Sequence, residues 1–182
     1  MTQTILSGII LYKIIIINNI AIKYNFIYNK KNRFIGMGVN IMGEEFKEFY
    51  DALKENLSGY DGEYASFIDY GPALYKLLSN LLMFYGKYLS KEDKLKISAA
   101  IAYYVVPLDV IPEQIYGPYG YVDDIFISVY VLKIIIDKYG IEISQKLWDE
   151  EEDLEEVIKE CYDKSIIVLE DTDKILEYVG LI

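Results

Sequence analysis

The 182-residue chain contains no histidine and a single cysteine, Cys161. Without histidine it cannot form a Ser-His-Asp or Cys-His nucleophile pair, a His-ligated zinc site or an imidazole general base. One cysteine excludes an internal disulfide and a CxxC site. Any chemistry would therefore have to rest on carboxylates, and the other possibility is a protein that catalyses no reaction.

Acidic residues are absent from the first 41 positions, where Lys and Arg give a net charge of +5. Residues 42–182 contain 13 Lys and 29 acidic residues, a net charge of −16. A strongly acidic body lacks the clustered Lys and Arg that contacts with phosphates need. The charge therefore predicts no nucleic-acid partner, and the lone cysteine favours a reducing, cytoplasmic location.

This change in composition divides the chain into an Ile-, Asn- and Lys-rich basic extension, residues 1–41, and an acidic domain, residues 42–182. Within the extension, residues 5–22 are almost long enough to span a bilayer, but Lys13 lies at the middle of that stretch. We consider two interpretations: a weak membrane anchor, or a start site assigned too early, with translation beginning at Met37 or Met42. The sequence leaves both open.

From residue 42 onward the apolar residues recur with the period of a helix, and alternation of the kind found in strands is hard to find. We expect an all-α fold, a compact bundle of about five or six helices around a proline-rich helix–turn–helix hairpin. Ser90 and Asp93 resemble a capping box at the start of one helix. The segment 122–139 is apolar nearly all round and is followed by Gly140, so it predicts a helix that is central in the bundle or lies in a membrane.

Three of the four prolines, Pro107, Pro112 and Pro118, lie within twelve residues of one another. Pro107 is expected to end a helix, and Pro112 to stiffen the turn that follows. Between them, Asp109 can accept hydrogen bonds from backbone N–H groups of the turn. The segment therefore predicts a rigid turn.

The second half of this turn contains glycines and ends in two acids. Gly117 and Gly120 would allow positive φ angles. Asp123 and Asp124 would begin the next helix, where the helix dipole favours negative charge. The whole segment predicts a stiff, acidic elbow between two helices.

This segment contains two prolines with an intervening Asp, followed by Gly-x-x-Asp-Asp. The pattern resembles the motif of the YkvA-like family, a small helical domain of unknown function (DUF1232). The resemblance covers roughly residues 95–136 and implies the hairpin fold, but no activity and hence no catalytic residue. In some relatives the hairpin lies in a membrane, which implies possible membrane association. The matching residues are Ala102, Tyr103, Pro107, Asp109, Ile111, Pro112, Gly120, Asp123 and Asp124.

The carboxylates of the elbow are the candidate metal site. Asp109, Asp123 and Asp124 could converge there and bind a divalent cation through oxygen ligands, or act as acid and base in a hydrolase. The alternative is that they cap helices or lie in solvent. Apart from this possible divalent metal we expect no cofactor.

We therefore expect a non-enzymatic helical module, cytoplasmic or on the cytoplasmic face of a membrane, that acts through a protein partner or a membrane surface. The alternative is a metal-dependent hydrolase, and a homo-oligomer that hides the apolar excess is a further possibility. The acidic run 149–153 predicts the solvated first half of a helix or a docking face for a basic partner. Cys161 and Trp148 are expected in the core. The tyrosines near the elbow would either close the core or form an interfacial belt at a membrane; they are Tyr103, Tyr104, Tyr116, Tyr119 and Tyr121.

Overall fold

In the computed structural model the described residues are 41–57, 59–62, 64–105, 110–111 and 113–182. Residues Phe46–Ile182 form one compact unit, and the account below concerns that unit. The predictions for the basic extension fall on residues outside the described part. The same holds for Pro107, Asp109 and Pro112 of the elbow.

The described residues are helical and contain no strand, so the predicted all-α class is confirmed. Six of the described helices have eight residues or more, which agrees with the expected bundle. A π-helical turn, η1, extends α4, and a 3-10 turn, η2, precedes α7. In order, the elements are α2 (Ile41–Leu57), α3 (Ala65–Ile68), α4 (Gly71–Asn80), η1 (Leu81–Tyr85), α5 (Lys91–Val105), α6 (Glu113–Tyr116), η2 (Gly117–Tyr121), α7 (Val122–Tyr139), α8 (Ile141–Gln145), α9 (Leu154–Val168) and α10 (Thr172–Val179).

The local signals for helix ends operate as expected at several boundaries. Pro72 lies in the first turn of α4, where a missing N–H costs nothing. Ser90 Oγ accepts the Asp93 N–H over 3.1 Å at the start of α5. Gly140, with φ of 83°, follows the last residue of α7, so this helix has the predicted bounds.

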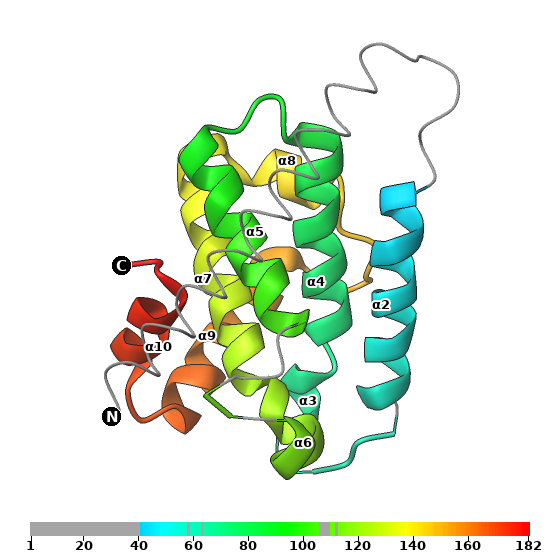
Figure 1. Ribbon diagram of the computed structural model, residues 1–182, viewed down its shortest axis with the longest axis vertical. Helices are drawn as coiled ribbons and strands as arrows, with labels where there is room; N and C mark the ends of the chain where they lie inside the picture. The colour runs from blue at the N-terminus through cyan, green and yellow to red at the C-terminus, as the bar shows by residue number, and fades with distance from the viewer. Residues whose placement is uncertain (1–40, 58, 63, 106–109, 112) are drawn as a thin grey trace, which may run out of the picture. The chain divides into compact units, whose positions relative to one another are not determined.

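The core is built around α7, which packs against α4, α5 and α9 (Figure 1). Lys133, the charged residue at the middle of α7, is exposed and lies 3.7 Å from the centre of the Tyr162 ring. The packing of α7 against three other helices confirms the central position predicted for residues 122–139. In the part of the chain that the structure describes, no helix has the length and apolar content that crossing a bilayer requires. The fully buried α7 side chains include Val122, Ile125, Ile127, Val129, Val131, Leu132 and Ile135.

The acidic run 149–153 is a loop between α8 and α9, so the prediction of a helical first half was wrong there. The helix begins later because Asp153 serves as its N-cap, accepting the Glu156 N–H over 3.1 Å. Trp148 Nε1 also donates a 2.8 Å hydrogen bond to the Glu152 carbonyl, which closes the loop. Trp148 and Cys161 are buried, as expected.

Candidate functional site

Helices α5 and α7 form an antiparallel hairpin joined by the elbow, residues 106–121, and Figure 1 shows the small helix α6 at the lower end of the hairpin. This arrangement brings the end of α5 next to the start of α7. It also brings the start of α5 next to the end of α7. Each of these two junctions contains a buried or nearly buried aspartate.

At the elbow end, Tyr103 of α5 and Asp123 of α7 hold the turn between them. The Tyr103 hydroxyl donates to Asp123 Oδ2 over 2.7 Å and accepts the Val110 N–H over 2.9 Å. The same Asp123 oxygen accepts the Ile111 N–H over 3.1 Å. We call Tyr103, Asp123 and these two backbone N–H groups the elbow staple.

The elbow staple places a carboxylate in a fully buried position. Burial raises the pKa of Asp123 to about 6, although the hydrogen bonds from Tyr103 and Ile111 act in the opposite direction. Asp123 Oδ1 accepts no hydrogen bond from the described residues, which leaves part of the charge uncompensated. Burial, followed by the charge of Asp123, likewise raises the pKa of the Tyr103 phenol.

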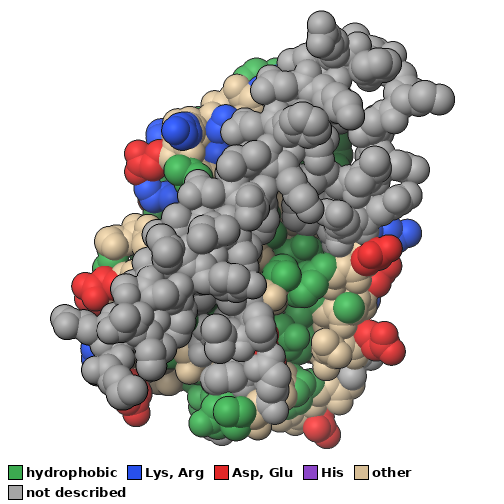
Figure 2. Space-filling view, in the orientation of Figure 1, with side chains coloured by type: hydrophobic (Ala, Val, Ile, Leu, Met, Phe, Trp, Pro, Cys, Tyr) green, Lys and Arg blue, Asp and Glu red, His purple; other side chains and the backbone are tan. Residues whose placement is uncertain are grey.

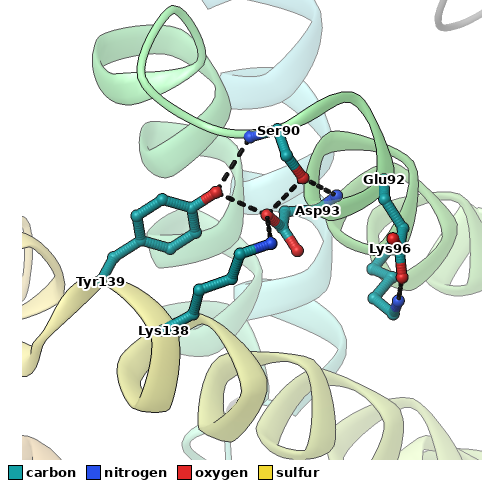
Figure 3. Close-up of polar contacts among 6 residues, drawn as sticks. All are labelled: Ser90, Glu92, Asp93, Lys96, Lys138 and Tyr139. Carbon is teal, nitrogen blue, oxygen red and sulfur yellow. Dashed lines mark hydrogen bonds and ion pairs between the residues drawn. The ribbon is translucent and has the colours of Figure 1, made fainter.

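At the opposite end, Asp93 of α5 is held by the end of α7 (Figure 3). Asp93 Oδ2 accepts hydrogen bonds from Tyr139 over 2.5 Å, from Ser90 over 2.5 Å and from the Lys138 ammonium over 2.7 Å. The Tyr139 hydroxyl in turn accepts the Ser90 N–H over 2.9 Å. We call these four residues the cap staple.

The cap staple shifts the pKa of its aspartate, Asp93, in the opposite direction. Burial alone would raise the pKa of Asp93, but the hydrogen bonds from Lys138, Ser90 and Tyr139 outweigh burial and lower it to about 2. The hairpin is thus joined at both ends by the same device. In each staple an aspartate in the first turn of one helix accepts a hydrogen bond from the hydroxyl of a tyrosine in the last turn of the other helix.

Two glycines, Gly117 and Gly120, shape the elbow. Gly117 has φ of 60°, as predicted. Gly120 does not have positive φ; a Cβ there would lie 2.5 Å from Glu113 Cα and 2.7 Å from Glu113 N. The prediction for Gly120 was therefore right in residue type and wrong in reason, because close packing against the backbone of α6 is what requires glycine.

Of the three predicted metal ligands, Asp123 and Asp124 are fully buried and Asp109 lies outside the described residues. Asp124 lies near Tyr104, whose pKa is raised well above its usual range by burial and then by the Asp124 charge. Within the described ranges, no group of three Asp, Glu or Cys side chains is arranged to hold a metal ion. The three-carboxylate site stays a prediction.

The outer face of the elbow end carries exposed apolar side chains, which the sequence pattern did not reveal. Val105, Val110, Ile115 and Tyr116 are between 51% and 73% exposed. Figure 2 shows hydrophobic side chains at the lower edge of the view, where Figure 1 places α6. We call these four residues the elbow patch.

The elbow tyrosines divide between the core and this surface. Tyr103, Tyr104 and Tyr121 are buried, whereas Tyr116 is exposed. Tyr119 is half-buried, and its ring centre lies 6.2 Å from that of Tyr116 and 5.8 Å from that of Tyr64. The tyrosines therefore mainly close the core, and one of them contributes to the elbow patch.

These features define a helical hairpin domain stapled at both ends. A family model described as "Protein of unknown function (DUF1232)" matches residues 93–130, from the aspartate of the cap staple through the elbow and into α7. The uncharacterised protein ORF9 of Methanothermobacter thermautotrophicus is 40% identical over 130 residues, which cover 71% of this chain and 88% of that protein. The chain belongs to the DUF1232 family. No solved structure matches it.

Proposed function

We propose that this chain is a non-enzymatic docking module that binds another protein through the elbow patch. The observation that supports the proposal is the exposure of four apolar side chains between the end of α5 and the end of α6, with Ile115 at 73%. Apolar side chains that gather on an otherwise polar surface are typical of interaction sites. The patch lies beside the elbow staple, which binds the N–H of Val110, a residue of the patch.

The elbow patch is attached to the folded hairpin at two points. The N–H of Val110 is bound by Tyr103, and the backbone of Glu113 packs against Gly120. A preformed surface loses less conformational entropy on binding than a flexible one. The buried aspartate of the staple therefore has a positioning role, and Ile115 and Tyr116 make the contacts.

The charge of the domain favours a protein over a membrane. Residues 42–182 carry a net charge of −16. Anionic bilayer surfaces attract basic segments and repel acidic ones. The same argument disfavours a second copy of this chain and favours a partner whose apolar face is surrounded by Lys and Arg. A location in the cytoplasm, or at the cytoplasmic face of a membrane through such a partner, is part of the proposal.

A photoreactive residue placed at position 115 tests this proposal in cells that make the chain, with the same residue at Tyr88 as control. Tyr88 is also exposed and lies in the turn before α5, at the other end of the hairpin. We expect a distinct protein to crosslink at 115 and not at 88, and the purified partner to bind the purified chain. Flotation of the wild type with anionic vesicles, lost in Ile115→Asp, would instead point to a membrane and overturn the proposal.

The alternative of a divalent-metal hydrolase rests on Asp109, Asp123 and Asp124. Its test is Asp109→Asn, with unfolding measured with and without a chelator. If Asp109 only bonds the turn, the substitution lowers stability by about 0.5–2 kcal/mol in both conditions. A loss of stability seen only when metal is present would mean that Asp109 helps to bind a cation. It would support the hydrolase, which needs such a cation beside the buried carboxylates of Asp123 and Asp124.

A further inference from the structure

The connection between η1 and α5 lies at the end of the bundle opposite the elbow, and it presents aromatic side chains to solvent. Figure 1 shows this connection at the top of the view, beyond the ends of the helices that it joins. Phe84 is 58% and Tyr88 62% exposed, and the Tyr88 ring centre lies 6.3 Å from that of the half-buried Tyr85. Large apolar side chains that gather on an exposed surface are typical of contact sites.

The backbone of this connection sets the exposure of both aromatic residues. In the π-helical turn η1, Leu81 and Leu82 are buried, whereas Phe84 is exposed. A π turn holds more residues than an α turn, so it changes which of the following side chains point to the core, and such turns often occur at functional sites. The Tyr88 N–H then donates to the Tyr85 carbonyl over 2.8 Å, which fixes the position of the second exposed ring.

The same end of the bundle is basic, although the body as a whole is acidic. Residues 84–96 contain four lysines and two acids, and the neighbouring segment 137–146 contains two of each. Both acids of the first segment are held in ion pairs by lysines. Lys91 and Lys94 form no ion pair with the residues that the structure describes. This end therefore carries a local surplus of positive charge in a domain whose net charge is −16.

The lysines lie next to the exposed aromatic residues. Lys87 Nζ is 4.5 Å from the centre of the Tyr88 ring, and Lys91 and Lys94 follow in the first turns of α5. Figure 2 shows Lys and Arg side chains at the upper left, where Figure 1 places the start of α5 and the end of α7. We call Phe84, Lys87, Tyr88, Lys91 and Lys94 the cap tip. It combines apolar rings with ammonium groups on one projecting edge of the bundle.

We infer that the cap tip binds the surface of a bilayer that contains anionic lipids. Aromatic rings favour the level of the lipid headgroups, and lysines beside them attract anionic headgroups. The acidic charge elsewhere in the body does not prevent this contact, because exposed charges farther away than the Debye length of about 8 Å are largely screened. A protein surface is the less suitable occupant, since a projecting edge offers little area and a stable protein interface buries about 800 Å² on each partner.

The elbow end lacks this combination of residues. Residues 105–121 contain no Lys or Arg, so nothing there offsets repulsion from an anionic bilayer. The cap tip and the elbow patch share no residue and lie at opposite ends of the hairpin. A chain held at a bilayer by the cap tip would keep the elbow patch accessible to its partner. The inference is independent of the proposed function, and either can fail without the other.

A polarity-sensitive dye attached to the full chain tests the inference. The dye is attached after Phe84→Cys or, as the control, after Ile115→Cys; both side chains are more than half exposed, and the native Cys161 is buried. Each labelled chain is titrated with vesicles of phosphatidylglycerol mixed with phosphatidylcholine. We expect a saturable blue shift of the dye at position 84, none at 115, and none with phosphatidylcholine alone. No shift at 84, an equal shift at 115, or an equal shift with the neutral vesicles would overturn the inference.

Two double variants of the chain labelled at position 84 separate the cap tip from the total charge. Lys91→Gln with Lys94→Gln removes two lysines of the cap tip, whereas Lys54→Gln with Lys159→Gln removes the same charge from exposed positions of α2 and α9. None of the four forms an ion pair with the described residues, so both variants should fold. We expect the first to weaken the affinity for anionic vesicles at least about tenfold and the second less than about twofold. Equal effects of the two variants would place the contact elsewhere in the chain and overturn the inference.

Discussion

The carboxylate of Asp123 and the hydroxyl of Tyr103, 20 positions apart in the sequence, are joined by a 2.7 Å hydrogen bond that closes the elbow. The other end of the hairpin repeats the bond between Asp93 and Tyr139, 46 positions apart. The two staples differ in their donors: Asp93 accepts bonds from the Lys138 ammonium and the Ser90 hydroxyl, whereas Asp123 Oδ1 has no partner among the described residues. This difference gives the two aspartates opposite pKa shifts and opposite effects of pH on stability.

Asp123→Asn should remove a pH dependence of the free energy of unfolding between about pH 4 and 7. The folded chain holds the Asp123 proton with a pKa of about 6, above its ordinary value of 3.8. The contribution of this group is therefore complete below about pH 4 and is lost as pH rises through 6. We expect the wild type to lose up to about 3 kcal/mol relative to Asp123→Asn over that window. Urea unfolding of both proteins at several pH values measures the difference, which should not be constant.

Asp93→Asn should show the reverse behaviour. The pKa of Asp93 is lowered to about 2, so its contribution is present above about pH 4 and is lost as pH falls toward 2. We expect the variant to be less stable than the wild type by about 2 kcal/mol at pH 7, with little difference near pH 2. Thermal or urea unfolding at both pH values checks this, with the exposed Glu155→Gln as control. A deficit of the same size at low pH would show that the ionised carboxylate is not the stabilising group.

Tyr103→Phe should destabilise the chain by about 1–3 kcal/mol, because it removes a donor from the buried Asp123 and an acceptor from the Val110 N–H. Hydrogen exchange at the Val110 amide should accelerate in the same variant. The control is Tyr88→Phe, which removes an exposed hydroxyl and should change stability by less than about 0.5 kcal/mol. If the two substitutions cost the same, the elbow staple does not hold the turn.

Gly120→Ala should be more damaging than Gly117→Ala. The new Cβ at position 120 would overlap the backbone of Glu113, and we expect a cost of about 1–3 kcal/mol or more. At position 117 nothing lies within 4 Å, so only the left-handed φ opposes alanine, at about 1–2 kcal/mol. Chemical unfolding of the two variants gives the order directly. The opposite order would place the constraint in the φ angle rather than in the contact with α6.

The helices could be predicted from the sequence because their signals are local. The continuous apolar run followed by Gly140 defined α7 to the residue, and the Ser90–Asp93 pair marked the start of α5. The loop at 149–153 was missed because acids are common both in first turns and in loops. Only the bond from Trp148 to Glu152 and the Asp153 cap distinguish the two cases.

The site was less predictable because its interactions connect distant parts of the chain. The motif contains both Tyr103 and Asp123, but the bond between them depends on the antiparallel packing of α5 and α7, as does the bond between Asp93 and Tyr139. The sequence indicated that position 120 needs a glycine, but the reason, close contact with the backbone of Glu113, is visible only in the structure. The exposure of Ile115 had no signal in the sequence, because it depends on which side of the short helix α6 packs against the rest of the chain.

The affinity of the purified crosslinked partner for three forms of the chain tests the docking proposal most directly. The forms are the wild type, Tyr116→Asp in the elbow patch, and Tyr88→Asp at the other end of the hairpin; the two tyrosines are 57% and 62% exposed. We predict that Tyr116→Asp weakens the affinity at least about tenfold, as expected for loss of an aromatic anchor, while Tyr88→Asp stays within about twofold of the wild type. Equal affinities for all three forms would contradict the elbow patch as the binding surface.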